Sequence, residues 1–538
     1  AGHERLTRCR VFSLPMPRHR LKWGEWASKS MRERERRRVS FLLPMLLLYA
    51  LFLLGAPLFL LVLIGAWYVA LVTLESMGSL DRMDATRVLG IILMLRTGRG
   101  KKVLDRISRN RRFWRVYGEL SIWLCFLVMI GVILLLFVSA IETALHPPDE
   151  YIPTGDLLLI PGVTSFVPFW WPAIALIIAL IIHEYSHGIQ ARAHGMRLRS
   201  FGLLLVGPVP IGAFAEPEEM EMTRAPRRDR MRLFAAGPSI NIFATYVTLI
   251  LLSAVSSGLV AEHDGVHARG IVEGGAAEGA GLMPYETITH IDGIGFSDYE
   301  GFSERMDSLS AEDVAVFTVL SSPAEEGARE SRDLDITLGD RYEHVSALCE
   351  GDDECIEQSG GAEPGDAFLG IYDVRPGTAG VDGYSYIVSG DYSFGVTAIV
   401  ALIEPLIMLQ TPIALNGQTM VLEERAMLVV GDGLVASALG IDGMLMLFDF
   451  LFWLVWINFL LGFANLIPMV PFDGGHLVRD GVHSVLNGEI SLGRYGRLRL
   501  GGGMHPMRIE AIANRISNMS SFLILLVLVI PIIIPRIL

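Results

Sequence analysis

The stretch that decides the fold is Trp171-Pro-Ala-Ile-Ala-Leu-Ile-Ile-Ala-Leu-Ile-Ile-His183-Glu184-Tyr-Ser-His187. Within this stretch, all residues before His183 are apolar, which is typical of a helix in a lipid bilayer. His183 and His187 lie one helical turn apart on the same face, so their imidazoles can bind one metal ion. Glu184 can then act as general base on a metal-bound water. Because ionisable groups are costly at membrane depth, these residues indicate a Zn²⁺ site rather than a chance match.

The composition supports a membrane protein that also has a large polar portion. The chain has 538 residues, of which 51% are hydrophobic, and its mean hydropathy is +0.44. Its net charge of -13 is uneven, because residues 261–445 hold 34 Asp/Glu against 7 Arg and no Lys. An acidic domain of this kind disfavours nucleic acid as a partner.

The apolar runs predict a polytopic α-helical integral membrane protein with about six or seven spans. A basic arm (1–40) precedes an N-terminal membrane extension (41–164). Within it, Phe41–Leu74 forms either a two-span hairpin or one long tilted helix, and we favour the hairpin because both flanks are basic. Further spans are expected at 118–144, 168–192, 233–259, 445–470 and 521–537.

The positions of the arginines predict the orientation of these spans. Arginine-rich segments near 197, 228 and 497 all fall on one side of the membrane, which we take as cytoplasmic. Residues 261–444 are then outside, and the histidine pair lies near the cytoplasmic side, with the cell membrane as the expected location.

Two apolar stretches do not fit a span. If Phe394–Leu415 crossed the membrane, the arginines of 471–515 would lie on the wrong side, so we expect an amphipathic or re-entrant segment on the outer face. Phe201–Pro217 is rich in glycine and proline and is expected to be re-entrant or sheet-like beside the histidine helix.

A catalytic zinc site needs a third protein ligand and an open position for water. The candidate is Asp473, which follows two prolines and precedes two glycines in Asn465-Leu-Ile-Pro-Met-Val-Pro-Phe-Asp473-Gly-Gly-His476. A solvated turn would explain this segment taken alone. Its expected depth matches that of His187, which favours a ligand.

With these motifs the chain resembles the site-2 protease family of intramembrane zinc metalloproteases. A third match, Ala236-Gly-Pro-Ser-Ile-Asn241, opens the following span, and the resemblance covers a catalytic core at 165–260 and 445–480. It implies that His183, His187 and Asp473 bind zinc, that Glu184 activates water, and that Asn465 binds the substrate backbone or oxyanion. We expect Asn241 to be structural, tying helices together.

The resemblance extends to Val272–Gly293, which looks like the start of an inserted α/β PDZ-like domain at 261–340 on the extracytosolic side. The usual Gly-Asp of such domains is Tyr285-Glu286 here. The region 341–444 is membrane-associated or extracytosolic with no assigned fold, and 481–538 holds a basic cytoplasmic segment and the final span. Cys349 and Cys355 could form a disulfide if they lie outside the cell.

The family implies cleavage of a transmembrane protein substrate within the lipid bilayer, in regulated intramembrane proteolysis, after an upstream protease has shortened that substrate. Two alternatives remain. Another class of membrane metalloprotease could take a glutamate from a later helix as third ligand. A non-catalytic metal-binding scaffold or transporter would use the histidines as an ion path, but it would not need Glu184.

Overall fold

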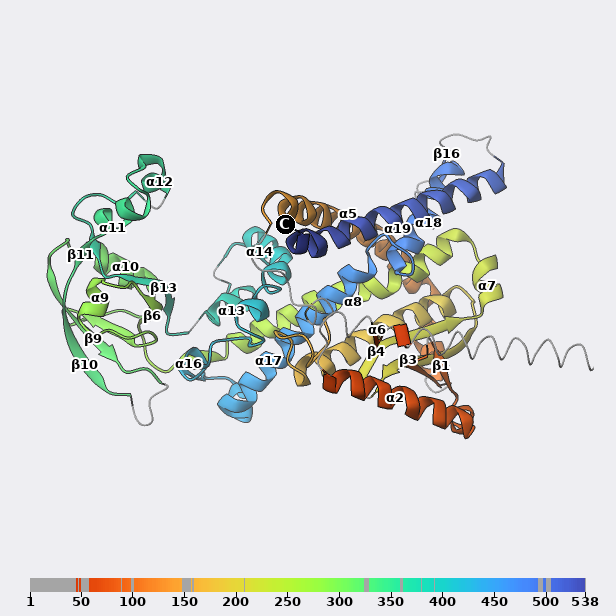
Figure 1. Ribbon diagram of the computed structural model, residues 1–538, viewed down its shortest axis with the longest axis horizontal. Helices are drawn as coiled ribbons and strands as arrows, with labels where there is room; N and C mark the ends of the chain where they lie inside the picture. Colours follow the sequence, from red (N-terminus) through yellow and green to blue (C-terminus); the bar gives the residue numbers. More distant parts are fainter. Residues whose placement is uncertain are drawn as a thin grey trace, which may run out of the picture. The chain divides into compact units, whose positions relative to one another are not determined.

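The computed structural model describes residues 45–46, 48–49 and 58–538, apart from 89, 98–100, 148–155, 157–158, 208, 324–328, 359–360, 379, 391, 492–496, 500–504 and 538. In this part of the chain, five helices are long and apolar enough to cross a membrane. They are α5 (Arg111–Leu145), α6 (Trp170–Ala193), α8 (Arg227–Ser256), α17 (Leu434–Asn465) and α19 (Pro506–Ile537), the last of them over Pro506–Pro531. The chain is therefore a multi-pass membrane protein with additional folded parts (Figure 1).

The chain divides into two compact units, the first of which comprises residues 1–97 and 202–212. Its described elements are α2 (Leu58–Ser76), α3 (Ser79–Arg82), β1 (Ala85–Val88) and β2 (Ile92–Thr97). The apolar side chains of Leu71, Leu80, Ala85 and Leu93 form its small core. The choice between a hairpin and one long helix for residues 41–74 lies largely outside the described residues, and α2 covers its second half.

The glycine- and proline-rich stretch 201–217 forms two strands, so the sheet-like alternative holds. These are β3 (Leu198–Val206) and β4 (Val209–Pro217), which extend β1 and β2 into a four-stranded sheet of order β1-β2-β3-β4. Residues 202–212 belong to the first unit, whereas the start of β3 and the end of β4 belong to the second.

The second unit contains all five long helices, and α6, α8 and α17 pack together in its centre. Aromatic side chains of α17, among them Phe448, Phe452 and Trp453, are almost fully buried against Leu249 and Leu252 of α8. These apolar contacts hold together α6, which carries the histidine pair, α8, which carries the Ala-Gly-Pro motif, and α17, which ends eight residues before Asp473. The shorter helices of this region are α4 (Lys101–Ile107), α7 (Glu219–Arg224) and α18 (Asp473–Leu486), followed by the strand pair β15 (Glu489–Ser491) and β16 (Arg497–Arg499).

Between α8 and α17 in the chain lies an α/β domain (Figure 1). Its six-stranded sheet has the order β10-β9-β7-β6-β13, and β8 pairs with β7. The strands are β6 (Val266–Ile271), β7 (Thr287–Ile291), β8 (Ile294–Gly295), β9 (Val314–Leu320), β10 (Ser331–Thr337) and β13 (Ile371–Pro376). The helices α9 (Ala276–Gly279) and α10 (Tyr299–Asp307) accompany it. Asp292 and Gly293 have positive φ and form the expected tight turn between β7 and β8.

The sheet of this domain takes in a strand beyond residue 340, where the sequence predicts the end of the PDZ-like domain. β13 pairs antiparallel with β6, from Ile371↔Ile271 to Pro376↔Val266. The strand pair β11 (Gly339–Asp340) and β12 (Ala367–Phe368), and the helices α11 (Arg341–Leu348) and α12 (Asp353–Gln358), lie between β10 and β13. Cys349 and Cys355 form a disulfide in this insertion.

After the sheet, four short helices lead to α17: α13 (Asp382–Ser389), α14 (Phe394–Ile407), α15 (Thr411–Ala414) and α16 (Leu422–Arg425). As expected, the apolar run 394–415 forms short helices rather than one span. Strand β14 (Leu428–Val430) then pairs with β5 (Leu259–Ala261), the strand that directly follows α8.

Candidate metal centre

His183, His187 and Asp473 come together although Asp473 follows the two histidines by 290 and 286 residues in the chain. Their ligand atoms lie within 4.8 Å of one another. The Nε2 atoms of the two histidines are 3.1 Å apart, and each lies 3.3 Å from Oδ2 of Asp473. Both histidines are buried, whereas the Asp473 side chain retains 14% exposure. Among the described residues, these three side chains form the one cluster of His, Cys, Asp or Glu that could hold a metal ion.

The hydrogen bonds behind the two imidazoles leave their Nε2 atoms free to bind a metal. Nδ1 of His187 lies 2.7 Å from the carbonyl oxygen of Leu233, which can only accept, so this nitrogen carries the proton. Nδ1 of His183 lies 2.7 Å from Oδ1 of Asn241. Both Nε2 lone pairs then face each other and the carboxylate, an arrangement that a cation stabilises.

The spacing of these three atoms fits a tetrahedral ion. Ligands bonded at about 2 Å to one tetrahedral centre are about 3.3 Å apart, and the three separations in this site are 3.1, 3.3 and 3.3 Å. Two imidazole nitrogens with one carboxylate oxygen is also a donor set that zinc accepts. The residues present therefore fit a bound zinc ion.

Helix α8 passes so close to the two imidazoles that only glycine fits at position 237. A Cβ atom there would lie 2.3 Å from Nε2 of His187 and 2.5 Å from Nε2 of His183. Both distances are far below van der Waals contact. The glycine of the Ala-Gly-Pro motif therefore keeps this side of the site open.

Glu184 is half-buried on α6, next to the first histidine. Its Oε2 accepts a hydrogen bond of 2.6 Å from the backbone N–H of Ala215, near the end of β4. This contact orients one carboxylate oxygen and leaves the other available to a water molecule or a substrate.

The two asparagines that the sequence singles out have different surroundings. Asn241 on α8 joins three helices. Its Oδ1 accepts from Nδ1 of His183 on α6, and its amide nitrogen donates to the Ala179 carbonyl on α6 and to Oδ1 of Asn458 on α17. This agrees with the structural role expected for it. Asn465, the last residue of α17, donates to the Leu461 carbonyl of its own helix at 3.0 Å. The structure does not link Asn465 to the histidines and Asp473.

Sequence reasoning missed three contributors: the Leu233 carbonyl, the steric need for Gly237, and Asn458. Asn458 does carry a signal, because an amide inside the apolar run of α17 needs a partner at membrane depth. A backbone carbonyl leaves no such trace in the sequence.

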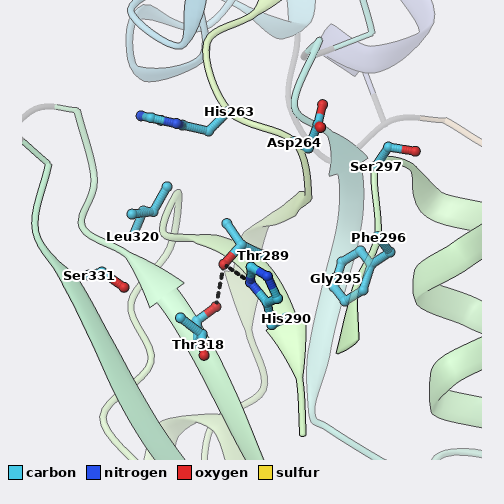
Figure 2. A pocket seen from close by; sticks show the side chains of 10 residues that line it. All are labelled: His263, Asp264, Thr289, His290, Gly295, Phe296, Ser297, Thr318, Leu320 and Ser331. Carbon is cyan, nitrogen blue, oxygen red and sulfur yellow. Dashed lines mark hydrogen bonds between the residues drawn. The ribbon is translucent and has the colours of Figure 1, made fainter. Parts of the chain in front are cut away.

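A second concave region lies in the α/β domain, away from these ligands in the chain. Its volume is about 660 Å³, and it is lined by residues of β7, β8, β9, the start of β10 and the loops after β5 and β8 (Figure 2). His263 and His290 both line it, but Figure 2 shows them apart from each other. His290 instead contacts the hydroxyl of its neighbour Thr289.

Comparison with known proteins agrees with this geometry. The uncharacterized protein MJ0971 of Methanocaldococcus jannaschii is 32% identical over 165 residues, which is 30% of this chain and 44% of that relative. The chain therefore matches less than half the length of this relative. The model of peptidase family M50 matches residues 171–492, more than half of the chain, and this range includes both histidines, Glu184 and Asp473. The chain therefore belongs to peptidase family M50, the site-2 protease family of membrane metalloproteases.

Proposed function

We propose that this protein is an intramembrane zinc metalloprotease that hydrolyses a peptide bond in transmembrane segments of other membrane proteins. The observation that carries the proposal is the convergence of Asp473, at the start of α18, on His183 and His187, which with Glu184 lie on a helix apolar enough to span a bilayer. Membership of the family supports a protease in general.

In this proposal, His183, His187 and Asp473 would hold the zinc and leave its fourth coordination position to water or substrate. The ion would supply Lewis-acid activation of a water molecule and of the scissile carbonyl. Glu184 takes the proton from that water and later delivers it to the leaving amine. The N–H of Ala215 keeps the carboxylate oriented for this transfer.

We assign substrate binding to Asn465 on the strength of its place in the motif. Its amide donates one N–H to the Leu461 carbonyl within α17, and the second N–H, or both after rotation of the side chain, can donate to a substrate carbonyl or oxyanion. Its position at the end of the helix, where the chain leaves regular structure, leaves room for such a rotation.

The positions along α8 support a site on the side opposite the α/β domain. Gly237 and the end of the helix at Ser256 are 19 residues apart, or about 29 Å at 1.5 Å per residue. Ion pairs near the start of α8, such as Arg230 with Asp480 and Arg228 with Glu119, gather arginines at the metal end. We infer that this end faces the cytoplasm and the α/β domain the exterior, in the cell membrane.

The α/β domain then acts as a PDZ-like filter outside the membrane. A transmembrane protein that an upstream protease has already shortened would pass it, and cleavage would release a cytoplasmic fragment. This is the arrangement of regulated intramembrane proteolysis.

The experiment compares purified wild-type protein with Glu184→Gln on a model transmembrane substrate, and measures bound zinc in the same samples. Because Glu184 is not a proposed ligand, the variant should keep its zinc and lose about 10²–10⁴-fold in turnover. The matched control is Glu142→Gln on α5, whose side chain is 68% exposed, and it should leave both values unchanged. Zinc binding without any cleavage by the wild type would favour the metal-binding scaffold instead.

A further inference from the structure

The segment 466–472, which joins α17 to Asp473 and includes Pro468–Pro471, is packed directly against the first turn of α18. A Cβ at Gly474 would lie 2.6 Å from the carbonyl oxygens of Leu466 and Ile467, and one at Gly475 would lie 2.6 Å from the backbone nitrogen of Val470. Backbone meets backbone here with no room for a side chain. The position of Asp473 is therefore tied to the position of this segment.

Helix α19 holds the same segment through two hydroxyl groups. Ser520 donates to the carbonyl of Pro468 at 2.9 Å. Ser521 accepts from the backbone N–H of Val470 at 3.1 Å and donates to its own helix at Ser517. These bonds satisfy peptide groups that no helix or sheet satisfies, which matters at membrane depth because water is scarce.

Helix α19 is also fixed near its beginning. Glu510 accepts from Arg227 of α8 at 2.7 Å and from Arg479 of α18 at 2.8 Å. Ser520 follows Glu510 by ten residues, or about 15 Å along the helix. The helix is thus attached to the core at two levels, and it lies entirely beyond residue 492, where the family match ends.

We propose that α19 is a positioning element of the metal centre, in which Ser520 and Ser521 hold Pro468–Pro471 so that the carboxylate of Asp473 points at the two histidines. The inference rests on the proposed zinc ligands. Metal sites tolerate displacements of only about 0.5 Å in their ligands, and a segment with two prolines has few backbone bonds of its own to prevent such displacement. The hydroxyls of α19 supply that restraint from outside the range that the family model matches.

The test uses the full-length protein in detergent, loaded with Co²⁺ in place of zinc, and measures Co²⁺ affinity and the visible spectrum. Ser520→Ala/Ser521→Ala should bind Co²⁺ about tenfold more weakly, since partners behind a ligand typically contribute 10–100-fold. Its spectrum should change as well. Ser520→Thr/Ser521→Thr, which keeps both hydroxyls, should restore affinity and spectrum.

The matched control is Ser517→Ala, a buried serine one turn earlier on the same helix, which should behave as wild type. If the double alanine variant folds poorly, the single variants Ser520→Ala and Ser521→Ala carry the test. Wild-type affinity and spectrum in the alanine variants would overturn the inference, as would a loss that threonine does not restore. Asp473→Ala, measured in parallel, reports on the proposed ligands themselves: unchanged Co²⁺ binding there would remove the proposed metal site.

Discussion

Gly237 determines whether the two imidazoles can share an ion, because the backbone of α8 runs against their metal-binding face. We expect Gly237→Ala to abolish zinc binding, since the added methyl would lie 2.3 Å and 2.5 Å from the two Nε2 atoms. Metal content of the purified variant, measured by mass spectrometry, checks this. Gly131→Ala on α5 is the control, because a Cβ there meets nothing within 4 Å. Full zinc occupancy in Gly237→Ala would show that α8 moves aside.

The residues that bear charge were predictable and so was the structural role of Asn241, whereas the other residues that position the site were not. His183, Glu184 and Asp473 stand out because ionisable groups are rare in apolar runs. Asn458 acts only through Asn241, which in turn contacts His183. This series of hydrogen bonds links three helices, and no local pattern in the sequence indicates which helices are neighbours.

At the scale of single elements, local patterns succeeded where the partner is near in sequence. The turn at Asp292-Gly293 and the strands within 201–217 follow from turn residues and from apolar character unsuited to a helix. β13 was missed because its partner β6 lies about 100 residues earlier, beyond an insertion with its own disulfide. Pairing at that distance is decided by burial in the folded core rather than by local propensity.

Helix α14 presents an apolar face that no described part of the chain covers. Phe394, Ile399, Leu402 and Ile407 are each more than half exposed, while Tyr246 of α8 bonds to the Leu402 carbonyl. A helix attached to a membrane span and apolar on its outer face is expected to lie at the surface of the bilayer. Insertion of each large apolar side chain would contribute roughly 1.5–3 kcal/mol.

A fluorophore on α14 should therefore be quenched by brominated lipids in reconstituted vesicles. The label is placed on Leu402→Cys, with Cys9 replaced by serine; Cys125 is fully buried and should not react. The control is a label on Tyr372→Cys in the α/β domain, where the native side chain is 58% exposed. Equal quenching at the two positions would contradict a membrane-surface role for α14.

For the whole molecule, the α/β domain is an insertion whose two ends meet. The N–H of Gly377 donates to the carbonyl of Gly265 at 2.9 Å, so the chain leaves the domain beside the point where it entered. The domain is also attached through Glu424 of α16, which is buried between His267 and Arg269. Burial raises the pKa of Glu424, but the hydrogen bonds from those two side chains outweigh it and hold the pKa below its usual value.

This geometry allows the gating role of the domain to be tested by removing it whole. Residues 266–376 are deleted, Gly265 and Gly377 are joined by a short flexible linker, and Glu424→Gln is added because deletion leaves that carboxylate without its partners. We expect the zinc content and the cleavage of a substrate with a short external part to persist, because no proposed ligand lies in the deleted range. Cleavage of substrates with long external parts should increase, since binding at a remote domain selects substrates without changing the hydrolytic step. Full-length Glu424→Gln is the control for the added substitution. A deletion variant that binds zinc yet cleaves no short substrate would mean that the domain positions the peptide instead of filtering it.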